Sequence, residues 1–129
     1  MARVGDLRGA VFALLLAVML AAAAPQVACS GPSRNIVSVK YRETPVDLAN
    51  PRFEHKETSE SSFVGGAWYD ARERYMVIRL SETYYHYCRL PVSTWSQFKW
   101  AGSFGRFYNS AIKGRFDCRA GGIPEYRDE

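Results

Sequence analysis

The chain has few of the side chains on which catalysis and metal binding usually depend. Among its 129 residues are two histidines, His55 and His86, and three cysteines, with no Cys-x-x-Cys pair or Cys/His spacing of the kind that holds zinc. No glycine-rich phosphate loop follows an expected strand, and no nucleophile elbow marks a serine. Acidic residues are scarce in the compact part, which disfavours paired catalytic carboxylates. We therefore expect that the protein is not an enzyme and that it binds neither a metal nor a cofactor.

The chain also lacks an apolar run of comfortable membrane-spanning length. Its longest run, residues 10–24, has fifteen residues, whereas a transmembrane helix needs about 20. Arg3 and Arg8 precede this run and small residues follow it, which is typical of a secretory signal. We assign residues 1–28 to a signal peptide; the alternative is an anchor that stays uncleaved. Export would place the protein in the periplasm, the envelope or the extracellular space.

Two cleavage points fit this signal. Gln26-Val27-Ala28-Cys29 resembles the box before the lipid-accepting cysteine of bacterial lipoproteins, which makes Cys29 a lipidation candidate. Gln26 stands where a leucine is usual in that box. Cleavage after Ser30 is the ordinary alternative, since small residues flank it. Contact with the membrane is expected only through the signal segment or a lipid on Cys29.

Positive charge is concentrated in the second half of the chain. Residues 30–61 carry five basic and five acidic side chains, whereas residues 62–119 carry nine basic and four acidic ones, a net charge of +5. The tail, residues 120–129, is acidic. A basic surface attracts phosphate, nucleic acid or anionic lipid, although a charge of this size also serves solubility alone.

The cysteines fit an exported protein. If Cys29 is lipidated or removed, Cys88 and Cys118 remain, and an oxidising compartment favours a disulfide between them. This bond would close a loop of about 31 residues and stabilise the fold by roughly 3–4 kcal/mol, which is large for a small core. Two free cysteines in an aromatic core are the alternative.

Hydrophobic alternation predicts a three-stranded antiparallel meander over residues 63–69, 75–80 and 84–88. One face of the middle strand is apolar and consists of Met76, Ile78 and Leu80. We interpret residues 29–61, with their prolines and a polar run, as an extended arm. Part of the arm is expected to dock on the domain, and part to separate the domain from the envelope.

Two short helices are expected after the strands. Ser93 is placed to cap a helix that runs to Trp100, and Ser103 to cap a second one. The second helix has an amphipathic stripe of Phe104, Phe107, Tyr108, Ala111 and Ile112. The fold class is therefore α+β: a small three-stranded antiparallel meander covered by two short helices, in a domain of residues 62–119.

These elements, in this order, resemble the KTSC domain, which is also found at the C-terminus of some lysyl-tRNA synthetases. The resemblance covers residues 62–116 and includes Trp68-Tyr69-Asp70, Leu90-Pro91 and the block from residue 103 to 109. The residues that match the family motif most clearly are Tyr85, Tyr87, Pro91, Ser103, Gly105 and Tyr108. The resemblance implies no catalytic set and no established activity; RNA binding has been suggested for the family from the synthetase context.

Two surfaces are candidates for binding. The first is the expected exposed face of the sheet, with Tyr84, His86 and Arg79. The second is a polar ridge on the second helix, formed by Arg106, Asn109 and Lys113, with Arg115 beyond it. We expect a non-catalytic exported module that binds an envelope protein or an anionic surface component. The alternative is RNA binding through exposed aromatics and a basic rim, which export disfavours because cytoplasmic RNA would be out of reach.

Overall fold

The computed structural model describes residue 23 and residues 33–127. The predicted signal segment, apart from Ala23, and the lipidation candidate Cys29 lie outside the described residues. From Ser33 onward the described residues belong to one compact unit. Within the described ranges, no helix combines the length and the apolar character needed to cross a bilayer.

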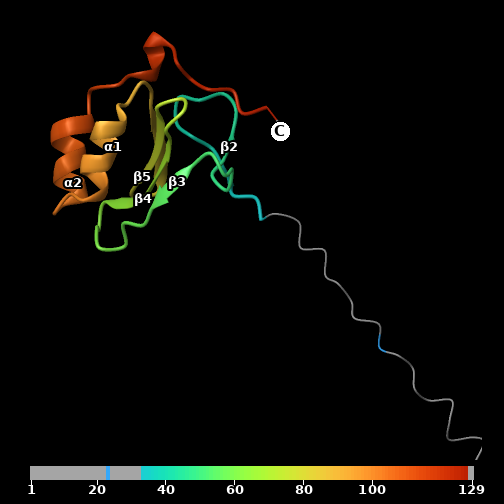
Figure 1. Cartoon of the computed structure of the whole chain (residues 1–129), viewed down its shortest axis with the longest axis horizontal. Helices are drawn as coiled ribbons and strands as arrows, with labels where there is room; N and C mark the ends of the chain where they lie inside the picture. The colour runs from blue at the N-terminus through green and yellow to red at the C-terminus, as the bar shows by residue number, and fades with distance from the viewer. Residues whose placement is uncertain (1–22, 24–32, 128–129) are drawn as a thin grey trace, which may run out of the picture. The chain divides into compact units, whose positions relative to one another are not determined.

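The centre of the unit is a four-stranded antiparallel sheet with the order β3–β4–β5–β6 (Figure 1). Its strands are β3 (Glu54–Lys56), β4 (Val64–Asp70), β5 (Tyr75–Leu80) and β6 (Thr83–Tyr87). The last three form the predicted meander, but the expected total of three strands is wrong because the arm adds β3. Main-chain pairing and the stacking of His55 on Trp68, with ring centroids 4.7 Å apart, hold this polar strand on β4.

One face of the sheet, here called the helix face, is covered by the helical segments (Figure 1). Three alternate residues of β5 point to it and are buried, as predicted: Met76, Ile78 and Leu80. Tyr85 and Tyr87 of β6 are half-buried against the same core. Trp95 and Phe98 close this core from the helix side, with the two rings 5.7 Å apart.

The helices differ from the prediction at their ends. α1 (Val92–Lys99) has Pro91 as its N-cap, so the expected cap at Ser93 is wrong; that residue lies inside the first turn. Ser103 does cap α2 (Phe104–Phe107), since its Oγ accepts a hydrogen bond from the Arg106 N–H at 3.3 Å. α2 continues as a π-helical turn, η1 (Tyr108–Ile112). Because the π-turn is wider than an α-turn, side chains beyond it leave the expected α-helical stripe.

The opposite face, here called the arm face, is covered by the arm and the tail. A two-stranded hairpin of β1 (Ile36–Val37) and β2 (Val46–Asp47) belongs to this cover, and β2 lies on the side of the sheet away from the helices (Figure 1). Val39 forms a single parallel bridge to Tyr84 at the outer edge of β6. The buried members of this second core are Val39, Val46, Leu48, Trp68, Tyr75, Val77, Cys88 and Cys118. The described part of the arm is thus integral to the fold.

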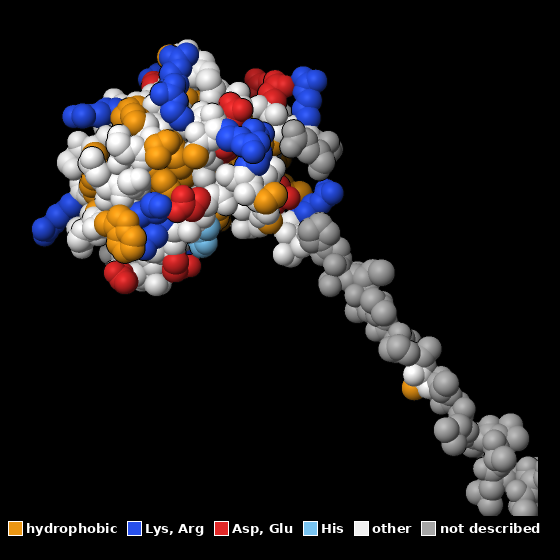
Figure 2. All heavy atoms as spheres, in the orientation of Figure 1, with side chains coloured by type: hydrophobic (Ala, Val, Ile, Leu, Met, Phe, Trp, Pro, Cys, Tyr) orange, Lys and Arg blue, Asp and Glu red, His pale blue; other side chains and the backbone are white. Residues whose placement is uncertain are grey.

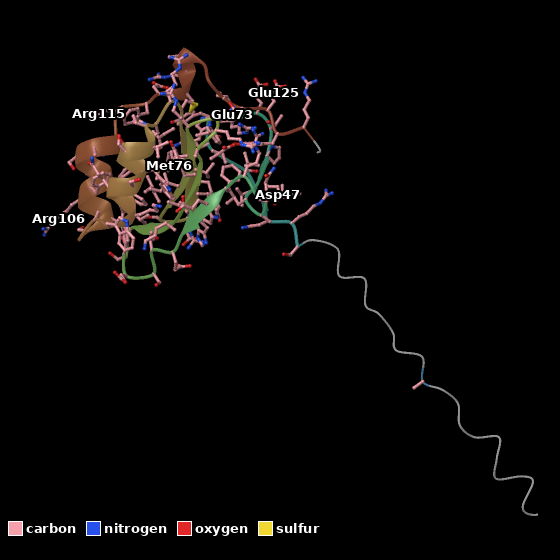
Figure 3. All side chains as sticks on the ribbon, in the orientation of Figure 1. Asp47, Glu73, Met76, Arg106, Arg115 and Glu125 are labelled. Atoms are coloured by element: carbon pink, nitrogen blue, oxygen red, sulfur yellow. A yellow bond between two sulfur atoms is a disulfide. The ribbon has the colours of Figure 1, made fainter. Side chains whose placement is uncertain are left out.

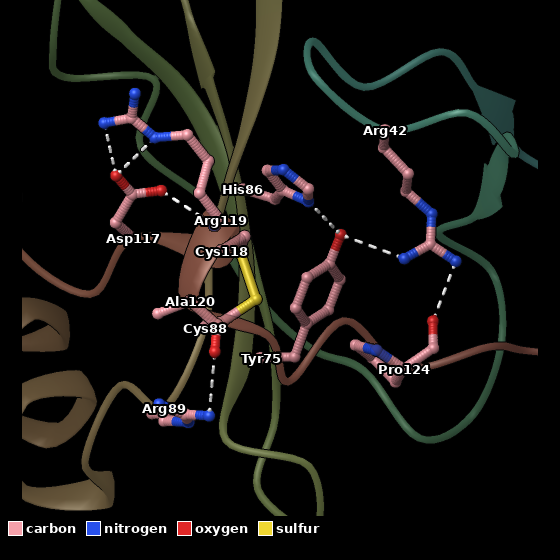
Figure 4. Close-up of a disulfide and its surroundings, with 10 residues drawn as sticks. All are labelled: Arg42, Tyr75, His86, Cys88, Arg89, Asp117, Cys118, Arg119, Ala120 and Pro124. Atoms are coloured by element: carbon pink, nitrogen blue, oxygen red, sulfur yellow. Dashed lines mark hydrogen bonds and ion pairs between the residues drawn. A yellow bond between two sulfur atoms is a disulfide. The ribbon is translucent and has the colours of Figure 1, made fainter.

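Cys88 and Cys118 form the predicted disulfide (Figure 4). Their Cα atoms lie 4.9 Å apart across a sequence separation of 30. The bond ties the end of β6 to a short 3₁₀ helix, η2 (Cys118–Ala120). Beyond η2, the Pro124 carbonyl accepts a hydrogen bond of 2.8 Å from Arg42 of the arm, so the two covering segments are also bound to each other.

Candidate functional site

The sheet surface predicted to contact a ligand is largely closed. His86 is 8% exposed, and Tyr84 is half-buried beside Trp68, with ring centroids 5.9 Å apart. The guanidinium of Arg79 folds over β4, where a Cβ on Gly65 would lie 2.4 Å from Arg79 Nε. The expected exposure of His86 is therefore wrong, because the arm and the tail cover this face. They also form hydrogen bonds with its polar side chains.

His86 ends a chain of hydrogen bonds that begins in the arm (Figure 4). Arg42 Nη1 donates to the Tyr75 hydroxyl at 3.4 Å, and that hydroxyl lies 2.9 Å from His86 Nδ1. Burial lowers the pKa of His86, the charge of Arg42 lowers it further, and Asp117 opposes both. Burial raises the pKa of Tyr75 to about 12. Both rings are therefore neutral at pH 7, and their contact links arm to sheet.

A groove of about 830 Å³ runs along the outer edge of β6. Its walls come from both sides of the sheet, because residues of both faces of β6 line it together with the segment that follows η1. The aromatic lining consists of Tyr41, Phe63, Tyr85, Tyr87 and Tyr108. The basic lining consists of Lys113, Arg115 and Arg119. This β6 groove brings the family-motif tyrosines together with two of the predicted cations.

Two tyrosine hydroxyls meet in the β6 groove. The hydroxyls of Tyr87 and Tyr108 lie 2.5 Å apart and share a hydrogen bond. Burial and then this hydrogen bond raise the pKa of Tyr87 above its usual range, so the ring stays neutral. Since one hydroxyl donates to the other, the pair keeps one proton that can be donated to an acceptor in the groove.

The basic side chains around the β6 groove differ in whether they form an ion pair. Arg119 is bound to Asp117, with Nη2 and Oδ2 2.6 Å apart. Lys113 and Arg115 are exposed and form no ion pair with another residue of the described part. Lys40 of the arm lies near the groove, with its Nζ 5.5 Å from the Tyr85 ring centroid. The groove therefore presents positive charge that no acid of the described part neutralises.

The predicted ridge of Arg106, Asn109 and Lys113 does not form one surface. Arg106 and Asn109 line a second, smaller hollow of about 430 Å³ with Ser103 and Gly105. Lys113 lines the β6 groove instead, after the π-helical turn. Figure 3 shows Arg106 and Arg115 well apart on the helical side of the sheet. In the view of Figure 2 the basic side chains are scattered and mixed with acidic ones.

The arm supplies contacts that the sequence did not reveal. Lys40, Tyr41 and Arg42 lie beside β6, a position that the predicted extended arm did not specify. Tyr126 of the tail donates a hydrogen bond of 2.7 Å to Asp70 Oδ2. Residues 36–41 alternate between apolar and polar side chains, but this short local pattern does not show which surface they cover. Among residues 33–127, no cluster of three or more His, Cys, Asp or Glu side chains is arranged to hold a metal ion.

Residues 60–116 match the model of the KTSC domain family. A crystal structure of a KTSC domain protein from Yersinia pestis is similar, with 30% sequence identity over 50% of this chain and 92% of that chain, and a TM-score of 0.47. No curated protein matches the chain. The described part of the arm before residue 60, Cys118 and the tail all fall outside the segment that matches the family.

Proposed function

This chain belongs to the KTSC domain family through residues 60–116, and on that premise we propose that it is an exported, non-catalytic module that binds an anionic partner in the β6 groove. The observation that carries the proposal is the shared lining of the groove. The Tyr87–Tyr108 hydroxyl pair and the side chains of Lys113 and Arg115 line the same hollow. A donor hydroxyl beside uncompensated cations suits a carboxylate or another oxyanion.

The surroundings of His86 support a binding role rather than catalysis. A general base needs its ring nitrogen within reach of a substrate or a nucleophile. His86 lines the β6 groove, but its Nδ1 is engaged by the Tyr75 hydroxyl, 2.9 Å away, in the arm–sheet contact. Lys113 and Arg115 supply the groove with positive charge that can hold an anion. The chemistry that these residues favour is capture of an anion.

Export is the second part of the proposal. The Cys88–Cys118 disulfide supports it, because such bonds persist in oxidising compartments. The signal-like residues 1–28 support it independently. In that setting the partner would be an envelope protein or an anionic surface component.

RNA binding is the alternative, and it has less support. Base stacking on a sheet requires exposed aromatic rings on its open face. Here the arm face is covered, and Tyr75, Tyr84 and His86 pack against the arm and tail. The aromatic rings left to an RNA are those of the β6 groove and Trp100, which is 84% exposed.

The proposal is tested with Lys113→Ala/Arg115→Ala, and with Arg72→Ala, an exposed cation in the β4–β5 turn, as the matched control. Fluorescence anisotropy would measure binding of a labelled polyglutamate peptide and, separately, of labelled oligouridine. We expect polyglutamate to bind, to weaken as salt rises, and to lose about tenfold or more in the double variant but not in Arg72→Ala.

Two results would change the conclusion. Equal polyglutamate binding by the wild type and the double variant would place the site outside the β6 groove. Salt-sensitive binding of oligouridine without binding of polyglutamate would make the RNA alternative the better description.

A further inference from the structure

We propose that the outer edge of β6, at His86, pairs with the main chain of an extended acidic peptide, and that this is the class of partner the β6 groove takes. The inference rests on the proposed function and narrows its anionic partner to a peptide strand. It depends on three observations: main-chain groups at the strand edge, the position of the groove across that edge, and the charge of the groove walls.

The first observation is a gap in the main-chain pairing of β6. The Tyr84 carbonyl accepts a hydrogen bond from the Lys40 N–H at 2.9 Å, and the Cys88 N–H donates to the Phe116 carbonyl at 2.8 Å. Alternate residues of an antiparallel strand point their main-chain groups to the same side. The N–H and C=O of His86, midway between these two, therefore also point outward. No main-chain group of the described residues pairs with them there.

The second observation is that this gap opens into the β6 groove. The groove is lined by His86 itself, by Tyr85 and Tyr87 on one side of the strand, and by Asp117 and Arg119 on the other. From residue 84 to residue 88 the edge spans about 13 Å, which accommodates an extended segment of about three residues. The bridging arm residue and the segment at residue 116 bound the gap at its two ends.

The third observation is the sign of the charge along the walls. Lys113 and Arg115 lie on the helix-face side of the groove, and Lys40 lies by the Tyr85 ring. Asp117, the one acidic residue in the lining, is bound to Arg119. Since alternate side chains of an inserted strand point to opposite walls, glutamate or aspartate at every second position would meet these cations.

A peptide suits this site better than a phosphate or a nucleotide. A free anion would use Lys113 and Arg115 but would leave the outward carbonyl of His86 without a donor. A peptide main chain offers both a donor and an acceptor at the spacing of the strand, which is how extended peptides add to open sheet edges. The Tyr87–Tyr108 hydroxyl pair then provides a donor for one side-chain carboxylate.

Backbone N-methylation distinguishes strand pairing from charge attraction. The disulfide-bonded exported chain is titrated with three labelled peptides of alternating glutamate and valine, acetylated and amidated at their ends. One is unmodified, one is N-methylated at every valine, and one at every glutamate. We expect the unmodified peptide to bind and one methylated peptide to lose about tenfold or more, the effect of a lost main-chain hydrogen bond, while the other still binds.

Amide hydrogen exchange gives an independent readout. The exchange of the His86 amide should slow when the unmodified peptide binds, while that of Arg72, in the exposed β4–β5 turn, should not change. Equal affinity for all three peptides, with unchanged exchange at His86, would overturn strand pairing. The proposed function would survive that result if Lys113→Ala/Arg115→Ala still weakened binding. Inorganic phosphate that competes as well as the peptide would also overturn the peptide assignment.

Discussion

The two faces of the sheet are closed in different ways. The helix face is covered by α1, α2 and η1, which follow the sheet directly in sequence and lie within the segment that matches the KTSC family. The arm face is covered by segments outside that match, namely the arm before residue 60 and the tail after residue 116. The helix face is thus covered by elements of the domain itself, and the arm face by the segments that precede and follow the domain in sequence.

The chemistry of the two faces differs as well. The helix face is closed by large apolar side chains such as Phe98 and Ile112, both fully buried. The arm face combines apolar contacts with side-chain hydrogen bonds, including those from Tyr126 to Asp70 and from Arg42 to Tyr75. Buried polar groups need their partners, so removing one segment would leave the others unsatisfied. We infer that the helix face determines whether the domain folds, and that the arm face depends on its cover.

The largest effect is expected at the helix face. Phe98→Ala removes a fully buried ring that packs against Trp95 and Phe104, and it should lower the free energy of unfolding by about 3–5 kcal/mol. Urea unfolding followed by tryptophan fluorescence measures this. If the variant does not fold, Phe98→Leu serves as the milder probe. A loss below about 1 kcal/mol for Phe98→Ala would show that this face does not dominate stability.

The disulfide is the strongest fastening expected on the arm face. Replacing both Cys88 and Cys118 with alanine should lower the free energy of unfolding by roughly 3–4 kcal/mol, because the unfolded chain is no longer constrained. Residues after 118 should also become more sensitive to protease. The control is reductant, which should reproduce the loss in the wild type and leave the double variant unchanged. Stability that reductant does not alter would mean that the bond contributes little.

The helix face was largely predictable from sequence, because its pattern is local. Alternation placed Met76, Ile78 and Leu80 on one side of β5, and Ser103 was correctly identified as a helix cap. The π-helical turn was not predictable, since it widens a helix whose apolar spacing also fits a regular α-helix. That turn separates Lys113 from the rest of the predicted ridge.

The arm face was not predictable, for a different reason. Alternation showed that Tyr84 and His86 share a side, but it cannot show whether a distant segment covers that side. The alternation at residues 36–41 is too short to show what Val39 covers, and the segment around Leu48 has no helix or strand period. β3 was not predictable either, because its three residues are polar and give no hydrophobic pattern. Its pairing is made by the main chain. The candidate site at the edge of β6 depends on these same long-range contacts.

Leu48 tests whether the arm contributes apolar stability. This side chain is 5% exposed, and Leu48→Ala should cost about 2–3 kcal/mol, the lower part of the range for buried leucine, because the arm can relax around the space. Ile36→Ala is the matched control from the same arm; its side chain is 59% exposed, and we expect a change within about 0.5 kcal/mol. Equal, small losses in both variants would mean that the arm lies on the sheet without stabilising it.

The smallest expected effect is the pH dependence at His86. Arg42 donates to the Tyr75 oxygen, which leaves the Tyr75 proton to donate to Nδ1 of neutral His86. Protonation of Nδ1 would remove that acceptor and place a second cation beside Arg42. The pKa of His86 is lowered in the folded state, so the unfolded chain binds more protons as the pH falls through about 6.5.

The stability that neutral His86 contributes is therefore full above about pH 6.5 and is lost as the pH falls toward the folded-state pKa. Urea unfolding at a series of pH values should show this decline in the wild type and a flatter profile in His86→Gln, whatever the absolute stability of the variant. Ile36→Ala, at an exposed and non-titratable position of the arm, is the control and should keep the wild-type slope. An identical slope in His86→Gln would mean that the contact between arm and sheet does not depend on the charge of this histidine. The hydrogen bonds of the arm face would then be less sensitive to pH than their geometry implies.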